Sequence, residues 1–281
     1  MCAICGCSNA EHDHREHGPA HAHAPARGYM EAYLNAQAHA HSEAEHGHGH
    51  PHIHARENGT TIALERDVLA KNDKVTERNR GWLAGRDILA LNLMSSPGSG
   101  KTTLLERTIR ELQAGLTISV LGGDQETPND AERIAATGCK TLQINTGKGC
   151  HLDAQMIAGA LRELDPEPRS VLMIENVGNL VCPALFDLGE DAKVGMLSGT
   201  EGEDKPLKYP HMFRAADLVL LTKCDLLPHL DFDVDRCVAY AHRINPCAEV
   251  LRLSARTGDG VDARYGWLRN ARDRQRETAF A

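Results

Sequence analysis

Residues 95–103 (SSPGSGKTT) have the composition and spacing of a loop that binds nucleotide phosphates. Glycines let backbone N–H groups point at phosphate oxygens, and a helix that begins at the end of the loop adds a favourable dipole. We expect Lys101 to contact the β- and γ-phosphates and the Thr102 hydroxyl to bind Mg²⁺. Ser95 departs from the G-x-x-x-x-G-K-[ST] pattern, and an ordinary glycine-rich turn is the alternative. The other expected loop contacts are Gly98, Ser99, Gly100 and Thr103.

Residues 221–225 (LTKCD) resemble the N-K-x-D segment that selects guanine in GTPases, with Thr222 in place of asparagine. A carboxylate at Asp225 can accept hydrogen bonds from the guanine N1–H and 2-amino group, whereas adenine offers no matching pair of donors. Lys223 is expected to lie along the face of the base. Residues 254–258 (SARTG) resemble a loop that supports the base. They add three candidates, namely Ser254, Ala255 and Arg256.

Two acidic residues follow predicted strands, at positions where nucleotide switches keep carboxylates for Mg²⁺ or water. They are Asp124 in GDQET and Glu175 in IENVG. We expect both to act with Lys101 in hydrolysis, Glu175 holding Mg²⁺ through water, and Gly178 to lie beside the γ-phosphate. Either acid taken alone can instead be a solvated loop residue. Because no arginine finger is recognisable, hydrolysis of GTP to GDP is expected to be slow.

Three thiols lie within the first seven residues, at Cys2, Cys5 and Cys7. Thiolates are soft ligands, and a flexible segment with sulfur and nitrogen donors permits the square-planar geometry that nickel accepts. We therefore predict a nickel site here, and a redox dithiol or a chance cluster is the alternative. Twelve of the 16 histidines lie between His12 and His54, which predicts loose binding and storage of divalent ions. A solubilising low-complexity tract is the alternative.

A second group of metal ligands is predicted inside the folded part of the chain. Cys150 and His151 precede an expected helix, and Cys182 follows Glu175 closely. Three ligands are one short of a closed tetrahedral site, which suggests that a symmetric partner subunit shares the nickel or zinc ion. Each cysteine taken alone is more typical of a core residue. The cysteines assigned a structural role are Cys139, Cys224, Cys237 and Cys247.

The elements that must position these residues begin after a metal-binding tail, residues 1–57, which is poor in large apolar side chains. Such a segment cannot offset its ordering entropy, so we expect disorder with a short helix around 29–40. Residues 58–281 are predicted to form one nucleotide-binding domain with a helical lead-in at 61–83. The predicted strands are 88–94, 117–121, 141–145, 170–174, 192–197, 218–222 and 249–253.

Helices are predicted between most of these strands, at 102–114, 129–136, 152–164 and 234–244. This alternation indicates an α/β fold with a mostly parallel sheet flanked by helices, and ligands beyond the carboxyl ends of the strands. A net charge of −8 gives no indication of a nucleic-acid partner. We find neither a membrane-spanning apolar run nor a signal peptide, so a soluble cytoplasmic protein is expected. In that compartment the nine cysteines are not expected to form disulfides.

Taken together, the motifs resemble the hydrogenase nickel-incorporation GTPase family (HypB type) over the whole chain. The most specific stretches are residues 2–7 (CAICGC), 95–103, 122–125 (GGDQ), 146–152 (TGKGCHL) and 175–183 (ENVGNLVCP). The serine at Ser95 is usual in that family. The resemblance implies a P-loop fold of the dimer-forming class (SIMIBI) that includes signal-recognition GTPases and MinD. It also implies a tight nickel site at Cys2, Cys5 and Cys7, and a nickel or zinc site at Cys150, His151 and Cys182.

The resemblance further implies a homodimer promoted by GTP and metal, and delivery of nickel to the [NiFe]-hydrogenase large subunit. A small zinc-containing nickel chaperone (HypA type) and a nickel-donating prolyl isomerase are the implied partners. Two alternatives stay open. One is a urease-type nickel GTPase, against which the cysteine cluster at residues 2–7 and the context of Cys182 and Pro183 argue. The other is a nickel storage protein, against which Lys101 and Asp225 argue, because storage needs no guanine-selecting residue.

Overall fold

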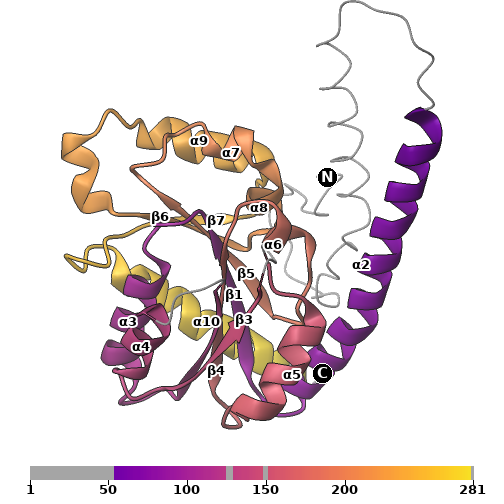
Figure 1. The fold of residues 1–281 in the computed structure, drawn as a ribbon. Coiled ribbons are helices and arrows are strands. Elements are labelled where there is room, and N and C mark those ends of the chain that lie inside the picture. The colour runs from indigo at the N-terminus through magenta and orange to yellow at the C-terminus, as the bar shows by residue number, and fades with distance from the viewer. Residues whose placement is uncertain (1–53, 125–128, 148–150, 280–281) are drawn as a thin grey trace, which may run out of the picture.

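The computed structural model describes residues 54–124, 129–147 and 151–279, and these contain one sheet of seven strands (Figure 1). Its order is β3-β2-β4-β1-β5-β6-β7, and each hydrogen-bonded pair of strands is parallel. The strands are β1 (Leu89–Ser95), β2 (Ile118–Asp124), β3 (Lys140–Asn145), β4 (Val171–Gly178), β5 (Ala192–Ser198), β6 (Leu218–Thr222) and β7 (Glu249–Arg252). The predicted α/β class is confirmed, and β2 and β4 continue past their predicted ends to Asp124 and Gly178.

The four helices predicted between strands are present with small shifts of their ends, and the lead-in helix is longer than predicted. The principal helices are α2 (His54–Ala84), α3 (Lys101–Leu112), α4 (Asn129–Ala135), α5 (Ala154–Leu164), α9 (Val234–Ile244) and α10 (Val261–Ala279). Short elements follow β4, β5 and β6, namely α6 (Cys182–Leu185), α7 (Lys205–Lys208), α8 (Pro210–Ala215) and the 3₁₀ helix η1 (Cys224–His229). Because α2 begins at His54, it includes residues assigned to the tail, and the boundary at residue 57 stays a prediction.

The side chains of residues 88–93 point alternately to the two faces of the sheet and so contribute to two separate parts of the core. Leu89, Leu91 and Leu93 pack with residues of α3, α4 and α10 on one face. Ile88 and Ala90 pack with α2 and α5 on the other face. The far part of that second face, beyond Met94, is covered by α6, α8 and α9. Burial on both faces explains why the strands are almost continuously apolar in sequence.

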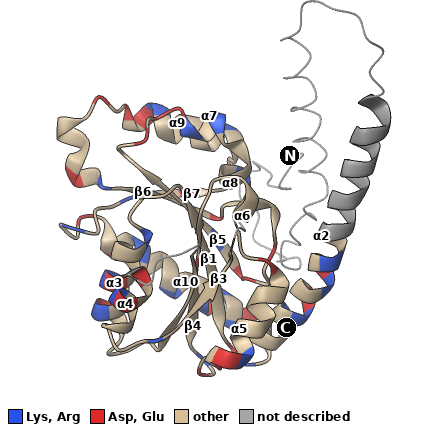
Figure 2. Ribbon diagram, viewed as in Figure 1, with Lys and Arg blue, Asp and Glu red and all other residues tan. Residues whose placement is uncertain are grey.

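The position of β1 at the centre of the sheet places its carboxyl end between those of β4 and β5. Loops that follow central parallel strands meet at this edge, where open α/β sheets bind their ligands. Charged residues on α3 and α4 are of both signs (Figure 2), and they pair as Arg110–Glu106 at 2.7 Å and Arg133–Glu106 at 2.9 Å. In the part of the chain that the structure describes, no helix is both long and apolar enough to cross a membrane.

Candidate nucleotide and metal sites

The loop between β1 and α3 has the backbone that its glycines make possible. Gly98 and Gly100 adopt φ values of 73° and 94°, in the left-handed region that favours glycine. Gly100 is the residue directly before α3, so the loop ends at the N-terminus of a helix. The dipole and unpaired N–H groups of such a helix end attract phosphate. This is the structural context that the sequence motif requires.

Ser95, which departs from the general motif, holds the lysine of the loop. The ammonium of Lys101 donates a hydrogen bond to Ser95 Oγ at 2.7 Å, and Ser99 Oγ donates to the same atom at 2.6 Å. All three side chains are buried. The serine therefore supplies a polar anchor within the loop that a glycine would lack.

The predicted Mg²⁺ ligands meet at the start of α3. Thr102 Oγ1 donates to Glu175 Oε1 at 2.7 Å, and Glu175 is only 8% exposed. A hydroxyl and a carboxylate are the hard oxygen donors that Mg²⁺ prefers, so this pair fits the ion. Gly178, at the end of the same strand, lies against the loop, since a Cβ there would be 3.0 Å from Pro97 Cγ. The backbone of β4 thus approaches the phosphate loop so closely that a side chain at this position would force Pro97 to move.

The residues predicted to bind the base are linked to the phosphate loop by Thr222. Its hydroxyl donates to the carbonyl of Ser99 at 2.7 Å. Thr222 occupies the position of asparagine in the N-K-x-D motif, and this hydrogen bond joins residues 221–225 to the phosphate loop. Lys223 has φ of 56°, in the left-handed region, directly before η1. Asp225 Oδ1 accepts a hydrogen bond from Ser254 Oγ at 2.6 Å. The structure therefore brings together the two segments that were predicted to bind the base.

The loop that carries Ala255 and Arg256 is fixed to α3. Arg107 Nη1 donates to the carbonyl of Ala255 at 3.0 Å, and Arg256 N donates to Ser254 Oγ at 3.2 Å. Gly258 adopts φ of 98° beside the Arg107 guanidinium. These contacts hold the supporting loop at a set distance from the phosphate loop, although the two lie far apart in sequence.

A cavity of 560 Å³ opens at the phosphate loop. This volume is within the range of small-ligand sites. It is lined by residues 97–103, residues 175–178, Lys223 and parts of β2, β3 and α4. Asp225 and Ser254 lie outside its lining. Asp124 ends β2, but its side chain is not among those that the structure describes.

Arg133 of α4 lines the same cavity and was not identified from the sequence. Its Nη2 donates to Thr103 Oγ1 at 3.2 Å and to Glu106 Oε2 at 2.9 Å. No local pattern distinguishes Arg133 from the other arginines, because only the packing of α4 beside α3 brings it to the loop. Arg133 is therefore a third cationic side chain in the described lining of the cavity, besides Lys101 and Lys223.

The second metal site is described only in part. His151 stacks on Phe186 with ring centroids 4.0 Å apart, which places it against the segment that follows Cys182. Burial lowers the pKa of His151, opposed by Asp153, and this favours the neutral imidazole that binds metals. The Cys182 thiol is half-buried and its backbone N donates to Asn179 Oδ1 at 3.3 Å. Cys150 lies outside the described residues, and among those described no group of three metal ligands occurs.

The remaining predicted metal ligands, Cys2, Cys5, Cys7 and the histidine tract before His54, lie outside the described residues. Of the four cysteines assigned a structural role, Cys237 is buried, Cys139 and Cys224 are half-buried, and Cys247 is exposed. Burial raises the pKa of Cys237 to about 12, which keeps this thiol protonated and unreactive. Burial likewise raises the pKa of Cys139 and of Cys224.

Comparison with known proteins identifies close relatives. The family model for the CobW/HypB/UreG nucleotide-binding domain matches residues 89–252, from the start of β1 to the end of β7. Hydrogenase maturation factor HypB of Rhizobium leguminosarum bv. viciae is 60% identical over 207 residues, which cover 74% of this chain and 69% of that protein. HypB of Azotobacter vinelandii is 49% identical over an alignment that covers 99% of this chain and 93% of the relative.

A solved structure shares both the fold and the sequence pattern. HypB from Helicobacter pylori in complex with nickel is 35% identical, with a TM-score of 0.68. The match covers 73% of this chain and 96% of that chain. Since the match includes most of that relative, the likeness applies to a complete nucleotide-binding domain and not to the phosphate loop alone.

Proposed function

Because this chain belongs to the CobW/HypB/UreG family of P-loop GTPases and, within it, to the HypB hydrogenase maturation factors, we propose that it delivers nickel to the large subunit of a [NiFe]-hydrogenase. In this proposal GTP binds with Mg²⁺ at the cavity above β1 and β4, and its hydrolysis to GDP and phosphate drives the delivery cycle. Nickel is the cargo of the protein, and GTP is its substrate.

The observation that carries this proposal is the continuity of residues 175–182. Glu175, at one end, is bonded to the Mg²⁺-binding hydroxyl of Thr102 at 2.7 Å. Gly178 packs on the phosphate loop, and Cys182 begins α6 four residues later. A change at the γ-phosphate can therefore reach a metal-binding thiol through one short segment. This is a physical route by which nucleotide state sets metal affinity.

In hydrolysis, Lys101 holds the β- and γ-phosphates and the N–H of Gly178 contacts the γ-phosphate. Thr102 and Glu175 would hold Mg²⁺, Glu175 through water, and Asp124 would orient the attacking water. When bound, Mg²⁺ neutralises charge that develops on the transferred phosphoryl group. We expect slow intrinsic hydrolysis, because Arg133 of the cavity is engaged by Thr103 and Glu106.

Guanine selection is assigned to Asp225, which accepts from N1–H and the 2-amino group, with Lys223 along the base. Ser254, Ala255 and Arg256 form the supporting loop. Support comes from the 2.6 Å hydrogen bond between Ser254 and Asp225, which holds the carboxylate in a set orientation before the base binds. Preorganised acceptors of this kind reject ligands that lack the matching donors.

The tight nickel site is assigned to Cys2, Cys5 and Cys7, and the second, for nickel or zinc, to Cys150, His151 and Cys182. We propose that two copies of the chain share the second site in a cytoplasmic homodimer promoted by GTP and metal. The proposed partners are a HypA-type chaperone, the hydrogenase large subunit and a nickel-donating prolyl isomerase. The match to the Azotobacter relative covers the tail as well as the domain, which supports a tail that takes part in the same function.

Replacing Cys182 with alanine should weaken the second metal site at least about tenfold, while GTP binding stays near normal, because one of three ligands is lost and the phosphate loop is not touched. Nickel and zinc titrations against a chelator, in a chain with Cys2, Cys5 and Cys7 changed to serine, measure this. Cys247→Ala is the matched control, since Cys247 is exposed. Unchanged affinities in the Cys182 variant would remove this residue from the site.

The assignment of the tight site is tested by titrating nickel into the intact protein and into the variant with Cys2, Cys5 and Cys7 changed to serine. Thiolate-to-nickel absorption is recorded with and without GTP. Loss of tight binding and absorption in the variant supports the tail site. Persistent tight binding would place the nickel in the domain or in the histidine tract, and would favour the urease-type or storage alternatives.

The proposed delivery of nickel depends on nucleotide binding, whereas nickel storage does not. We expect hydrogenase maturation to fail in cells that carry Lys101→Ala, and to fall only at low nickel in cells that lack residues 11–54. The reverse pattern would favour storage. The relatives named as hydrogenase maturation factors support the hydrogenase assignment over a urease-type one.

A further inference from the structure

Asn176 is a buried asparagine between the nucleotide site and the second metal site. It directly follows Glu175 in β4 and is 1% exposed. Its Oδ1 accepts hydrogen bonds from Leu152 N at 3.2 Å and from Val177 N at 3.0 Å. Leu152 is the residue next to His151. A single side chain therefore joins the backbone beside a metal ligand to the strand that carries the Mg²⁺-binding carboxylate.

The nitrogen of the Asn176 amide begins a second series of hydrogen bonds, which runs across the sheet to Asn92 and Glu190. Asn176 Nδ2 donates to Asn92 Oδ1 at 3.1 Å, and Asn92 Nδ2 donates to Glu190 Oε1 at 3.0 Å. Burial raises the pKa of Glu190, and Lys193, 3.7 Å away, opposes this shift. Asn92 and Glu190 are buried too. In such surroundings each broken contact leaves a polar group without a partner, so the three side chains are constrained to move together.

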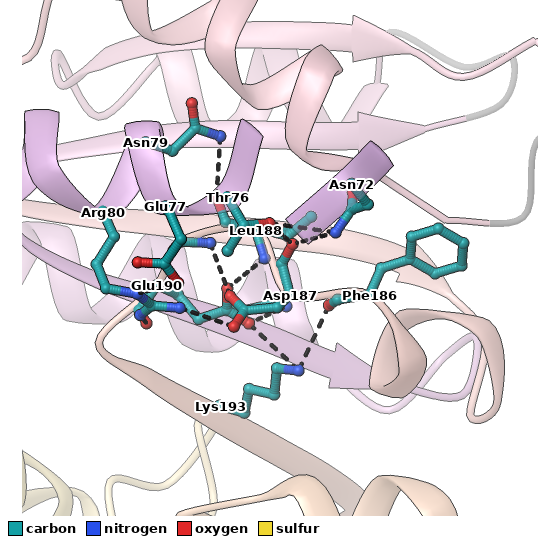
Figure 3. A network of polar contacts seen from close by, with 12 residues as sticks. Asn72, Thr76, Glu77, Asn79, Arg80, Phe186, Asp187, Leu188, Glu190 and Lys193 are labelled. Carbon is teal, nitrogen blue, oxygen red and sulfur yellow. Dashed lines mark hydrogen bonds and ion pairs between the residues drawn. The ribbon is translucent and has the colours of Figure 1, made fainter. Parts of the chain in front are cut away.

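Helix α2 anchors the far side of this arrangement (Figure 3). Asn72 Nδ2 donates to the carbonyl of Asp187 at 2.7 Å, while its Oδ1 accepts from Ala154 N at 2.8 Å. Asn79 Nδ2 donates to the carbonyl of Ala154 at 2.8 Å and to that of Leu188 at 3.1 Å. Two asparagines of one helix thus fix both the start of α5 and the loop before β5.

The contact between α2 and that loop is close as well as polar. Arg80 Nη2 donates to Asp187 Oδ2 at 2.7 Å (Figure 3). Gly189 adopts φ of 95°, and a Cβ there would lie 2.8 Å from Asn79 Cβ. The helix backbone therefore rests directly on the loop. This makes α2, the loop and the first turn of α5 one rigid unit.

His151 lies between this rigid unit and the nucleotide site. On one side, Ala154 is fixed to α2, and the His151 ring stacks on Phe186, which directly precedes the anchored Asp187. On the other side, Leu152 is bonded to Asn176, whose neighbour Glu175 contacts the Mg²⁺-binding threonine. Asn176 is also linked to this unit through Asn92 and Glu190, so a displacement of Asn176 is passed both to residues 151–153 and to the loop before β5.

We propose that Asn176 is a positioning residue that transmits the nucleotide state to His151, and thereby sets the metal affinity of the second site. The inference rests on the proposed function, which makes His151 a metal ligand. Gly178, at the end of β4, packs on the phosphate loop, so a γ-phosphate, which GTP has and GDP lacks, would shift β4 near its end. Asn176 carries this shift to Leu152 through its Oδ1. This route reaches the histidine, and is separate from the route along residues 178–182 that reaches the thiol.

The test measures coupling and not affinity alone. Nickel and zinc are titrated against a chelator into the full chain with Cys2, Cys5 and Cys7 changed to serine, in GDP and in a non-hydrolysable GTP analogue. We expect the two affinities of this parent to differ about tenfold, within the usual range of coupling between sites. In Asn176→Ala the ratio should fall to about one to three, measured with each nucleotide at saturation because Asn176 also lines the nucleotide cavity.

Asn245→Ala is the matched control, because Asn245 Nδ2 donates to three carbonyls, the shortest at 2.9 Å to Ala216, far from both sites. It should lower thermal stability and keep the affinity ratio. If Asn176→Ala does not fold, Asn176→Ser keeps a hydroxyl that is too short to bond Leu152 and carries the same expectation.

The outcomes separate this inference from the proposed function. A parent that binds no metal in either nucleotide state overturns both. A parent that binds metal equally in both states leaves the second site in place and overturns the coupling. If the parent shows the expected ratio and both Asn176 variants keep it, transmission through Asn176 is wrong while the second site and its nucleotide dependence stand.

Discussion

Changing Lys101 to alanine should abolish GTP hydrolysis, with an expected loss on the order of 10³-fold in kcat and a weaker affinity for GTP. The reason is that the ammonium is buried in the phosphate loop, where a positive charge acts on the β- and γ-oxygens with little screening by water. The fold should survive, because the Ser95 hydroxyl that Lys101 contacts also contacts Ser99. Phosphate release in single- and multiple-turnover assays, with calorimetric binding of GTP, gives both quantities.

Lys140→Ala is the matched control for this prediction. Lys140 begins β3 and its ammonium donates to the carbonyl of Asp165 at 2.7 Å, so it bonds a backbone oxygen and no phosphate. Hydrolysis by this variant should match that of the unaltered protein. Hydrolysis at the normal rate in Lys101→Ala would show that the cavity at the loop is not the catalytic site.

Changing Asp225 to alanine should remove the preference for GTP over ATP, with a loss of discrimination on the order of 10²–10⁴-fold. Two charge-assisted hydrogen bonds to guanine would be lost, and the Ser254 hydroxyl would lose its acceptor. Competition between labelled GTP and unlabelled ATP, GTP and inosine triphosphate measures the change directly. Inosine triphosphate lacks the 2-amino group, so in the unaltered protein it should bind with intermediate affinity.

A nearby carboxylate provides the control for the Asp225 variant. Asp233 caps α9, where its side chain accepts from Arg236 N at 2.9 Å, and Asp233→Ala should lower stability by about 1 kcal/mol without changing nucleotide preference. If Asp225→Ala keeps its preference for GTP, the guanine-selecting residue lies elsewhere and residues 221–225 act only through Thr222.

The sequence predicts the parts of this molecule whose signals are local. Strand runs such as 218–222 are apolar because both faces of the sheet are covered, so their positions follow from composition alone. The phosphate loop is likewise recognisable, because its backbone demands glycine at Gly98 and Gly100. These features need no knowledge of which strands are neighbours.

Other features depend on tertiary neighbours and were not predicted. Helix α10 was not predicted, because its many charged residues obscure the apolar pattern in the sequence. In the structure, Val261, Tyr265 and Leu268 form a buried stripe against the sheet. The role of Ser95 becomes clear only once Lys101 is seen to bond it. The asparagines of α2 give no signal in the sequence either, because their partners near Asp187 are more than 100 residues away.

This separation in sequence has a consequence for folding during synthesis, because the two segments are made at different times. The hydrogen bonds that fix α2 to the loop before β5 join residues 107 to 115 positions apart. At a synthesis rate of about 5–20 residues per second, α2 leaves the ribosome roughly 5–20 s before the loop that these hydrogen bonds join to it. Protease cleavage of chains stalled before and after residue 191 emerges would measure this interval. During it the three N-terminal thiols that we propose as nickel ligands have already left the ribosome, so they can bind metal before the nucleotide site has formed.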